Sequence, residues 1–336
     1  MIYRGKAPLR LSFAGGGTDI PPYPQQHGGV VLSATIDKYA YASLAPRPDT
    51  ELHVHSHDYN VSVRYDINNL SYDGQLDIVK SVVRNMSVEG GAELSLHCDA
   101  PPGSGLGSSS AMTAALIGVF KHWQRLPMTE YEIAQLAYYV EREDLGSAGG
   151  IQDQYATTFG GFNFIEFFDN TVLVNPLKVS PDILNELQYR LLLCYTGQTR
   201  PPSVCGEIMH EHATRLGMGQ LDNALDALKT VTLEMKRALL QRELDLFGDL
   251  LHWAWTNKKR LAHQISNAHL DEMYEVARKY GARGGKVVGA GGGGYLLLCC
   301  EADKKHIVAA HMEKLGGIAV GFAFEEGGLQ TWSVNH

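Results

Sequence analysis

The chain lacks a long apolar segment. No stretch of its 336 residues reaches the roughly 18 consecutive apolar positions that a membrane-spanning helix needs. Positive charge is also scarce, because 29 lysines and arginines are outnumbered by 37 aspartates and glutamates, which gives a formal net charge of −8. A chain with this balance carries no basic footprint for nucleic acid or for an anionic membrane. We therefore expect neither as a partner.

Cysteines are few. The five are an odd number and are scattered along the chain, and Cys299 and Cys300 lie in an apolar run where small core residues are expected. The first residues, MIYRGKAPLRLSF, contain no long apolar core of the kind that a secretory signal has. These features favour a reducing cytoplasm over an oxidising compartment.

The most informative segment is PPGSGLGSSSAM, from Pro101 to Met112. Its glycines at positions 103, 105 and 107 permit tight turns and close approach of the backbone to a ligand. Three serines follow, and then an apolar run that predicts a buried helix from about Ser109 to Arg125. A glycine loop that opens onto a helix N-terminus favours phosphate, because unpaired N–H groups and the positive end of the helix dipole meet there.

This segment differs from two commoner phosphate loops. It has no lysine after the glycines, as a Walker loop requires, and Ser108 stands where a dinucleotide fingerprint has its third glycine. A plain turn before a buried helix is the structural alternative.

The length of the chain favours two domains. We expect the first to span residues 1–182 and the second residues 183–336, with the boundary between Asn175 and Gln188. Short strand-like runs in the first half include Val30–Ile36 and Ala40–Leu44, and Thr129 with Glu132 predicts a helix that begins with a capping box. After a mostly helical region, the chain ends in a β-loop-β-α-β pattern that suggests an antiparallel sheet covered by helices.

Further polar residues stand beside glycine turns. Arg10 lies in a strand-like run, where a guanidinium suits the neutralisation of phosphate or the lowering of a neighbour's pKa. Asp19 follows a triple glycine and can accept hydrogen bonds from sugar hydroxyls. A surface ion pair and a self-capped turn are the structural alternatives. Asp153, after the paired glycines at 149 and 150, can accept a proton from a substrate hydroxyl or orient that hydroxyl.

The helix that ends in VEREDLG carries Glu141, Glu143 and Asp144. A carboxylate near a phosphate loop can bind magnesium, although most carboxylates on a helix form a solvated face. The GAGGGG segment (289–294) has more glycines than a hairpin needs, so it predicts close approach to a ligand or to the other domain, with a flexible loop as the alternative. The alternating His53, His55 and His57 have no cysteine nearby and favour an exposed strand over a metal site.

In order, APLRLSFAGGGTD, PPGSGLGSSSA, VERED…GGIQDQ and GAGGGG resemble the motif series of the GHMP kinases, the galacto-, homoserine, mevalonate and phosphomevalonate kinases. The resemblance extends from Ala7 to Gly294. It implies an α+β fold with two domains: an N-terminal β-α-β phosphate-binding domain and a C-terminal ferredoxin-like domain. ATP and a sugar would bind in the cleft between them.

The resemblance also implies roles for particular residues. The catalytic carboxylate would be Asp153, with Arg10 as its electrostatic partner, and magnesium would be held by Ser109 and Glu141, with Glu143 as the alternative to Glu141. The implied ATP phosphate site comprises Gly103, Ser104, Gly105, Leu106, Gly107, Ser108, Ser109 and Ser110. The implied sugar site comprises Gly17, Thr18, Asp19, Gly150, Gln152 and Gly292.

Within the family, AGGGTD and GGIQDQ are most similar to the heptose 7-phosphate kinases, which implies phosphorylation of the anomeric hydroxyl to give a 1,7-bisphosphate for nucleotide-activated heptose synthesis. The expected ligands are ATP with Mg²⁺ and a small sugar phosphate, and a homodimer is left open. A second anion site is then needed, for which we favour Arg200 over Arg283 and Lys178. The alternatives are a fucose- or galactose-type kinase that acts on an unphosphorylated sugar, a catalytically silent sugar-binding relative, and a structural protein whose glycine loops are only turns. The absence of the GEHTD motif in this chain weakens galactose as the substrate.

Overall fold

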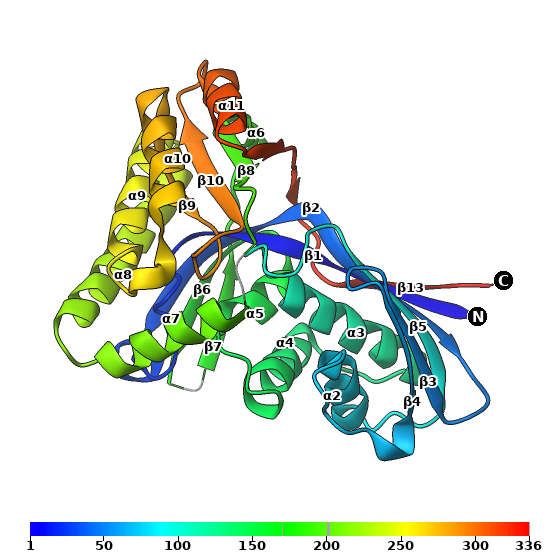
Figure 1. The fold of residues 1–336 in the computed structure, drawn as a ribbon. Helices are drawn as coiled ribbons and strands as arrows, with labels where there is room; N and C mark the ends of the chain where they lie inside the picture. The colour runs from blue at the N-terminus through cyan, green and yellow to red at the C-terminus, as the bar shows by residue number, and fades with distance from the viewer. Residues whose placement is uncertain (170, 200–201, 336) are drawn as a thin grey trace.

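A computed structural model describes residues 1–169, 171–199 and 202–335 (Figure 1). Two sheets organise these residues. The larger sheet is formed by β1 (Ile2–Ala14), β2 (Gly29–Pro46), β3 (Glu51–Ser56), β4 (Val61–Asp66), β5 (Ala92–Cys98), β6 (Phe162–Phe168), β7 (Thr171–Pro176), β12 (Phe324–Glu325) and β13 (Gln330–Val334).

Strand β2 is the centre of the large sheet. It pairs with β1 along one edge, while β6, β12 and β5 succeed one another along its other edge. The sequence pattern predicted two separate runs, Val30–Ile36 and Ala40–Leu44, but the structure has one continuous strand across the polar residues between them. The backbone remains extended there because Asp37 and Tyr39 bond to partners outside β1: Asp37 N donates to Ala323 O (2.9 Å) and Tyr39 N to an Asp99 carboxylate oxygen (2.8 Å).

The helices of the first half gather on one face of the large sheet (Figure 1). They are α2 (Asp77–Asn85), α3 (Ser108–Gln124), α4 (Glu130–Tyr138), the π-helix η2 (Tyr139–Asp144) and α5 (Gln152–Phe159), while the short α1 (Tyr23–His27) and η1 (Ile67–Asn69) lie in connections. Helix α3 is buried from Ser110 to Phe120 except at the half-buried Met112, which explains its almost uniformly apolar sequence. The capping box predicted at Thr129 and Glu132 is present.

The second sheet has the order β11-β8-β10-β9, and all of its pairs are antiparallel. Its strands are β8 (Leu191–Tyr195), β9 (Ala282–Val287), β10 (Tyr295–Cys300) and β11 (Ile318–Val320). The accompanying helices are α6 (Pro181–Arg190), α7 (Pro202–Arg215), α8 (Gln220–Leu240), α9 (Leu244–Lys258), η3 (His263–Ile265), α10 (Ala268–Lys279) and α11 (Lys305–Lys314). The expected antiparallel sheet with helices packed against it is thus confirmed.

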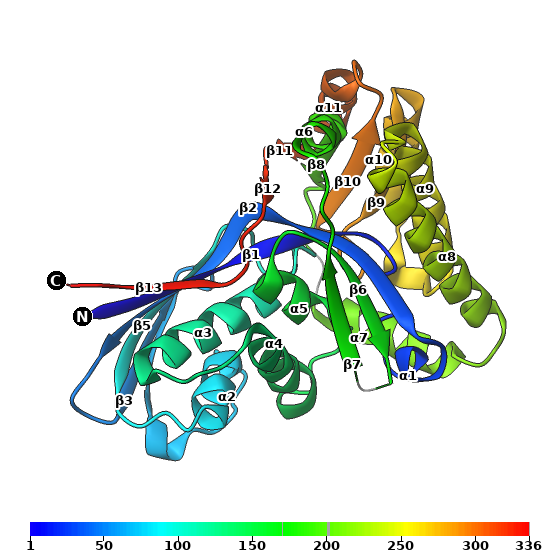
Figure 2. The same cartoon turned by 180° about the vertical axis from the view of Figure 1, so that it is seen from behind.

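The last strands return to the first sheet. Strand β13 pairs with β1 and β12 with β2, so both ends of the chain lie side by side at one end of the large sheet (Figures 1 and 2). The expected second domain, residues 183–336, therefore gives its final segment to the sheet of the first. The two units also share apolar packing, as in the contact of Phe13 with Phe247 at 5.4 Å between ring centroids. No helix in the described ranges is both long and apolar enough to cross a bilayer.

Candidate active site

A cavity of about 840 Å³ lies where the two units meet. Its walls come from the end of β1 and the following loop, the glycine loop before α3, the segment from η2 to α5, helix α7, the C-terminal end of α9 and the second glycine loop. Motifs that are more than 250 residues apart in the sequence therefore share one space. The volume fits a nucleotide together with a small acceptor.

The first glycine loop adopts the conformation that its composition predicted. Gly103, Gly105 and Gly107 have φ angles of 76°, 85° and 76°, in the left-handed region that side-chain-bearing residues rarely adopt. Six of the eight expected phosphate-loop residues line the cavity. The structure does not bring the other two, Ser104 and Leu106, to its wall, because their side chains are buried in the interior. The N-terminus of α3 thus faces the cavity with its first turn, as an anion site requires.

Glu141 is a buried carboxylate beside this helix start. Its oxygens accept hydrogen bonds from Ser109 Oγ (2.5 Å), Ser110 Oγ (2.6 Å) and Gln154 Nε2 (2.5 Å). The side chain is 2% exposed, and no lysine or arginine in the described part of the chain forms an ion pair with it. A buried anion held only by neutral groups is costly, and a hard cation would compensate it.

These oxygens therefore fit magnesium, and Ser109 and Glu141 are the residues that would hold it. Glu143, the alternative left open by the sequence, is exposed and does not line the cavity. The π-helical turn of η2 carries both glutamates, and π-helical turns are frequent at functional sites.

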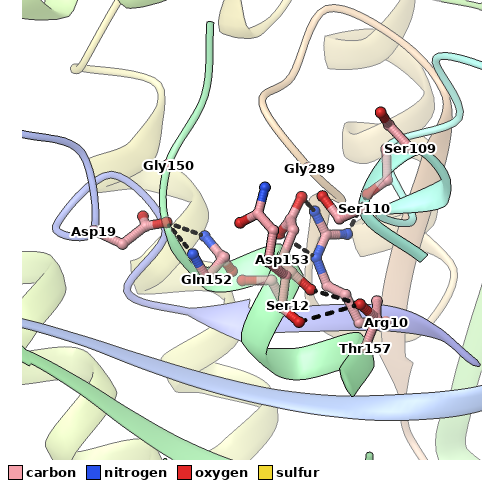
Figure 3. Close-up of polar contacts among 12 residues, drawn as sticks. Arg10, Ser12, Asp19, Ser109, Ser110, Gly150, Gln152, Asp153, Thr157 and Gly289 are labelled. Atoms are coloured by element: carbon pink, nitrogen blue, oxygen red, sulfur yellow. Dashed lines mark hydrogen bonds and ion pairs between the residues drawn. The ribbon is translucent and has the colours of Figure 1, made fainter. Parts of the chain in front are cut away.

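Arg10 and Asp153 form a bidentate ion pair on the cavity wall (Figure 3). Arg10 Nε lies 2.8 Å from one carboxylate oxygen and Nη2 lies 2.7 Å from the other. The third nitrogen, Nη1, donates to the carbonyl oxygen of Gly105, so the same guanidinium also contacts the phosphate loop. The arrangement places a carboxylate next to the space where a phosphoryl group would lie, and fork-to-carboxylate pairing fixes its orientation.

Asp19 marks a second polar corner, next to Gln152 (Figure 3). Its carboxylate accepts hydrogen bonds from Gly17 N (3.0 Å) and from both the main-chain and side-chain nitrogens of Gln152 (3.1 Å each). Gly150 also lines this corner. The expected sugar residues Gly17, Asp19, Gly150 and Gln152 are thus brought together.

Thr18 does not belong to this set. Its hydroxyl oxygen lies 2.8 Å from Gly15 O and 2.9 Å from Val30 O, which share its one proton, and it accepts a hydrogen bond from Val30 N (3.0 Å); the residue is fully buried. It closes the triple-glycine turn against β2, so the structure gives it a structural role and not a place on the cavity wall. Sequence order alone could not distinguish it from its neighbours.

The second glycine loop packs against the first. A Cβ on Gly105 would lie 2.4 Å from Val288 O, and a Cβ on Gly294 would lie 2.2 Å from Ser104 O. Gly289 and Ala290 line the cavity, whereas Gly292 N donates to Ile265 O (2.9 Å) and the residue lies outside the cavity wall. The close backbone approach expected of the second glycine loop is therefore made with the main chain of the first glycine loop, in the other unit.

The expected second anion site cannot be placed. Arg200 lies outside the described residues, and Arg283, one of the weaker candidates, pairs with Asp249 at 2.8 Å and does not line the cavity. The other weaker candidate, Lys178, is not on the cavity wall either.

Several residues of the site were missed by sequence reasoning. Ser12 lines the cavity two positions after Arg10, and the alternation of a strand could have predicted that they share a face. Lys258 lines the cavity and donates to Gly289 O. Lys286 is buried behind the site and donates to Ser12 O at 2.7 Å. Burial lowers the pKa of Lys286 well below its usual value, and nearby Lys258 and Arg10 act in the same direction, whereas Asp19 opposes them.

Two more wall residues have chemistry that suits the expected ligands. Tyr59 is 60% exposed, lies in the turn before β4 and lines the cavity together with Gly103, so its ring can stack on a nucleobase. Arg142, on η2, lines the cavity and donates to Gly150 O (3.2 Å). The sequence carried no distinct signal for either residue.

Comparison with known proteins agrees with this geometry. The pattern described as GHMP kinases N terminal domain matches residues 76–161, and the pattern described as GHMP kinases C terminal matches residues 235–316. The chain is 39% identical over 338 residues to the D-glycero-alpha-D-manno-heptose 7-phosphate kinase of Campylobacter jejuni, covering 98% of this chain and 99% of that protein.

Solved structures of heptose phosphate kinases and other sugar kinases share this fold. A crystal structure described as a D-glycero-D-manno-heptose 1-phosphate kinase from Bacteroides thetaiotaomicron has a TM-score of 0.82 and 34% identity, covering 99% of this chain and all of that one. The galactokinase of Lactococcus lactis with bound galactose has a TM-score of 0.79 at 20% identity, covering 98% of this chain and 95% of that one, a likeness of fold alone.

Proposed function

Because this chain belongs to the GHMP kinase family and is a phosphotransferase, we propose that it transfers the γ-phosphoryl group of ATP to the anomeric hydroxyl of D-glycero-D-manno-heptose 7-phosphate. The product is the 1,7-bisphosphate, an intermediate suited to nucleotide-activated heptose synthesis. The observation that carries the proposal is the single cavity in which the phosphate loop, Glu141 and the Arg10–Asp153 pair meet. Near-full-length identity to a heptose 7-phosphate kinase supports this choice of acceptor.

In this proposal the donor lies along the first glycine loop. The main-chain N–H groups at the start of α3 bind the phosphates, and Tyr59 stacks on the base. Ser109 and Glu141 would hold magnesium, which would neutralise charge on the phosphate oxygens. Arg10 adds a fixed positive charge on the side of Asp153.

The acceptor lies between Asp153 and Asp19. The anomeric oxygen attacks the γ-phosphorus, the bond from that phosphorus to the bridging oxygen breaks, and ADP leaves. Asp153 accepts the hydroxyl proton or a hydrogen bond from it, while both of its oxygens are held in place by Arg10. Positioning and charge neutralisation supply most of the acceleration in such reactions.

The substrate's own phosphate needs cations away from the transfer point. Arg142 and Lys258 are cationic residues that line the described part of the wall. They are the groups that we assign to the 7-phosphate, together with any contribution from Arg200.

The five cysteines form no disulfide with one another, which supports a reducing, cytoplasmic setting.

An acceptor panel tests the proposal. ADP release is measured with D-glycero-D-manno-heptose 7-phosphate, the corresponding 1-phosphate, unphosphorylated heptose, fucose and galactose. We expect the 7-phosphate to give the highest kcat/KM, and ³¹P NMR to locate the new phosphate on C1. Faster turnover of fucose or galactose would assign the chain to the alternative sugar-1-kinases, and turnover of the 1-phosphate alone would contradict anomeric transfer.

A further inference from the structure

Three residues that line the cavity carry buried side-chain polar atoms that make no hydrogen bond of normal geometry with the described residues. They are Ser12 Oγ, Gln152 Oε1 and both ring nitrogens of His212. Buried polar atoms in proteins are almost always paired, so a group of such atoms on residues that line one cavity points to a polar ligand. His212 contributes two of these atoms and is only 1% exposed.

Helix α7 presents His212 to the cavity from one of its faces. Cys205, Ile208, Met209 and His212 recur at helical spacing, and all four line the cavity. The face is therefore mostly apolar, with one imidazole in it. An apolar wall with a single donor-and-acceptor group is typical of a pocket that orients a small polar ligand.

The neighbouring residue holds the helix in position. Glu211 accepts hydrogen bonds from His263 N (3.0 Å) and from Arg215 Nη1 (2.8 Å), which ties α7 to η3. At the other end of the cavity-facing surface, Cys205 Sγ donates to Ala148 O at 3.6 Å. These contacts hold helix α7, and therefore the imidazole of His212, in a fixed position.

His212 lines the cavity near Asp19 and Gly17, which both affect its pKa. Figure 3 shows Asp19 and Gln152 on one side of Asp153 and the serines that start α3 on the other side. An acceptor whose reacting hydroxyl lies beside Asp153 would therefore present other hydroxyl groups to the Asp19 corner and to His212.

The ring is neutral near pH 7. Burial lowers the pKa of His212 below 6.5, and Arg215 adds to this effect, whereas Asp19, Asp222 and the main chain of Gly17 oppose it. A neutral imidazole has one N–H donor and one acceptor nitrogen, which matches a hydroxyl group. A phosphate is a poor occupant here, because the Asp19 carboxylate would repel it.

We propose that His212 is a specificity-determining residue whose imidazole binds a hydroxyl group of the acceptor sugar at the Asp19 end of the cavity. Ser12 and Gln152 bind neighbouring polar groups of the same molecule. The inference rests on the proposed function only in requiring a polyol acceptor, and it does not depend on which sugar is accepted.

The first test separates acceptor binding from catalysis. His212→Phe keeps a planar ring but removes both nitrogens, and His212→Gln restores a donor and an acceptor. We expect His212→Phe to raise the acceptor KM on the order of tenfold, with kcat changed much less and the ATP KM unchanged. His212→Gln should recover part of the loss. His210→Phe, at an exposed position on the same helix, is the matched control.

The second test identifies the contact. Singly deoxygenated analogues of whichever acceptor the wild type phosphorylates are compared in wild type and His212→Phe. One analogue should be discriminated by the wild type but not by the variant, because the hydroxyl and the imidazole are each other's partners.

An unchanged acceptor KM in His212→Phe, or equal discrimination by both proteins for every analogue, would overturn the inference. Parallel increases in the KM for acceptor and ATP would also overturn it, since they indicate a structural role. Rejection of heptose 7-phosphate by the wild type would instead refute the proposed acceptor and leave this test intact.

Discussion

At the residue scale, the site depends on an arginine and an aspartate that lie 143 positions apart. Arg10 was predicted as a phosphate or carboxylate partner because guanidinium has several donors in a fixed plane. Its bidentate contact with Asp153 arises only when β1 and the start of α5 are packed together. The pair is shielded from solvent, with side-chain exposures of 4% and 20%. Its geometry therefore constrains the carboxylate more than a surface ion pair would.

Asp153→Asn tests the role of the carboxylate. The amide keeps the shape but loses the charge and one acceptor oxygen, so we expect kcat to fall by about 10²–10⁴-fold. The ATP KM should change little, because the phosphate loop is untouched. Steady-state kinetics measures both quantities. Asp303→Asn, a matched substitution at an exposed position, serves as the control, and full activity of Asp153→Asn would exclude a direct role.

The pH dependence of folding stability tests, independently of catalysis, whether the imidazole of His212 is neutral. The folded pKa lies below that of an unfolded histidine, so the unfolded state binds the proton first as pH falls through 6.5. The stability of the wild type should therefore decline as pH falls below this value. His212→Gln should remove part of this decline, measured by urea unfolding between pH 7.5 and 5. Identical pH profiles would show that the imidazole titrates alike in both states.

At the element scale, helices with a strong periodic or buried pattern were predicted closely. The expected helix from about Ser109 to Arg125 is α3, Ser108–Gln124, because a glycine loop begins it and its apolar residues fit a fully buried core helix. Strand β2 was harder to predict, since polar residues interrupt its apolar pattern and only its partners keep it extended. The Gly-rich loops were recognised individually, but their contact with each other was one of several open alternatives.

Gly105→Ala tests that loop contact. Gly105 has φ +85°, and an added Cβ would lie 2.4 Å from Val288 O, so the two loops must separate. We expect an increase in the ATP KM of roughly tenfold, in addition to a loss of about 1–2 kcal/mol in stability from the left-handed backbone. Gly217→Ala is the control, because its φ is +82° and nothing lies within 4 Å. If both variants bind ATP like the wild type, the loop contact does not position the donor.

At the scale of the whole molecule, the C-terminal segment connects the two units. Strand β13 covers the outer edge of β1, and Thr35 Oγ1 donates to Glu325 O at 2.7 Å. The expected division at residues 182 and 183 treated the chain as two consecutive blocks. A short strand carries little local information about which sheet edge it will join, so the return of the chain could not be predicted.

Deletion of residues 324–336 tests the importance of this return. The deletion removes β12 and β13 and leaves the edge of β1 unpaired, so we expect the thermal midpoint to fall by several degrees or more. Differential scanning fluorimetry compares it with a deletion of residues 335 and 336 alone. Equal midpoints would mean that the returning strands contribute little to stability.

Local chemistry was enough to predict the tight turns of the first glycine loop, the buried helix after it, the antiparallel second sheet and the family of kinases that the motifs resemble. Each depends on residues that are neighbours in the chain, such as Gly107 and Ser108 at the start of α3. Packing between distant segments decided the rest: the Arg10–Asp153 contact, the structural place of Thr18, and the position of His212. These depend on through-space distances between elements, and the spacing of residues along a chain does not determine such distances.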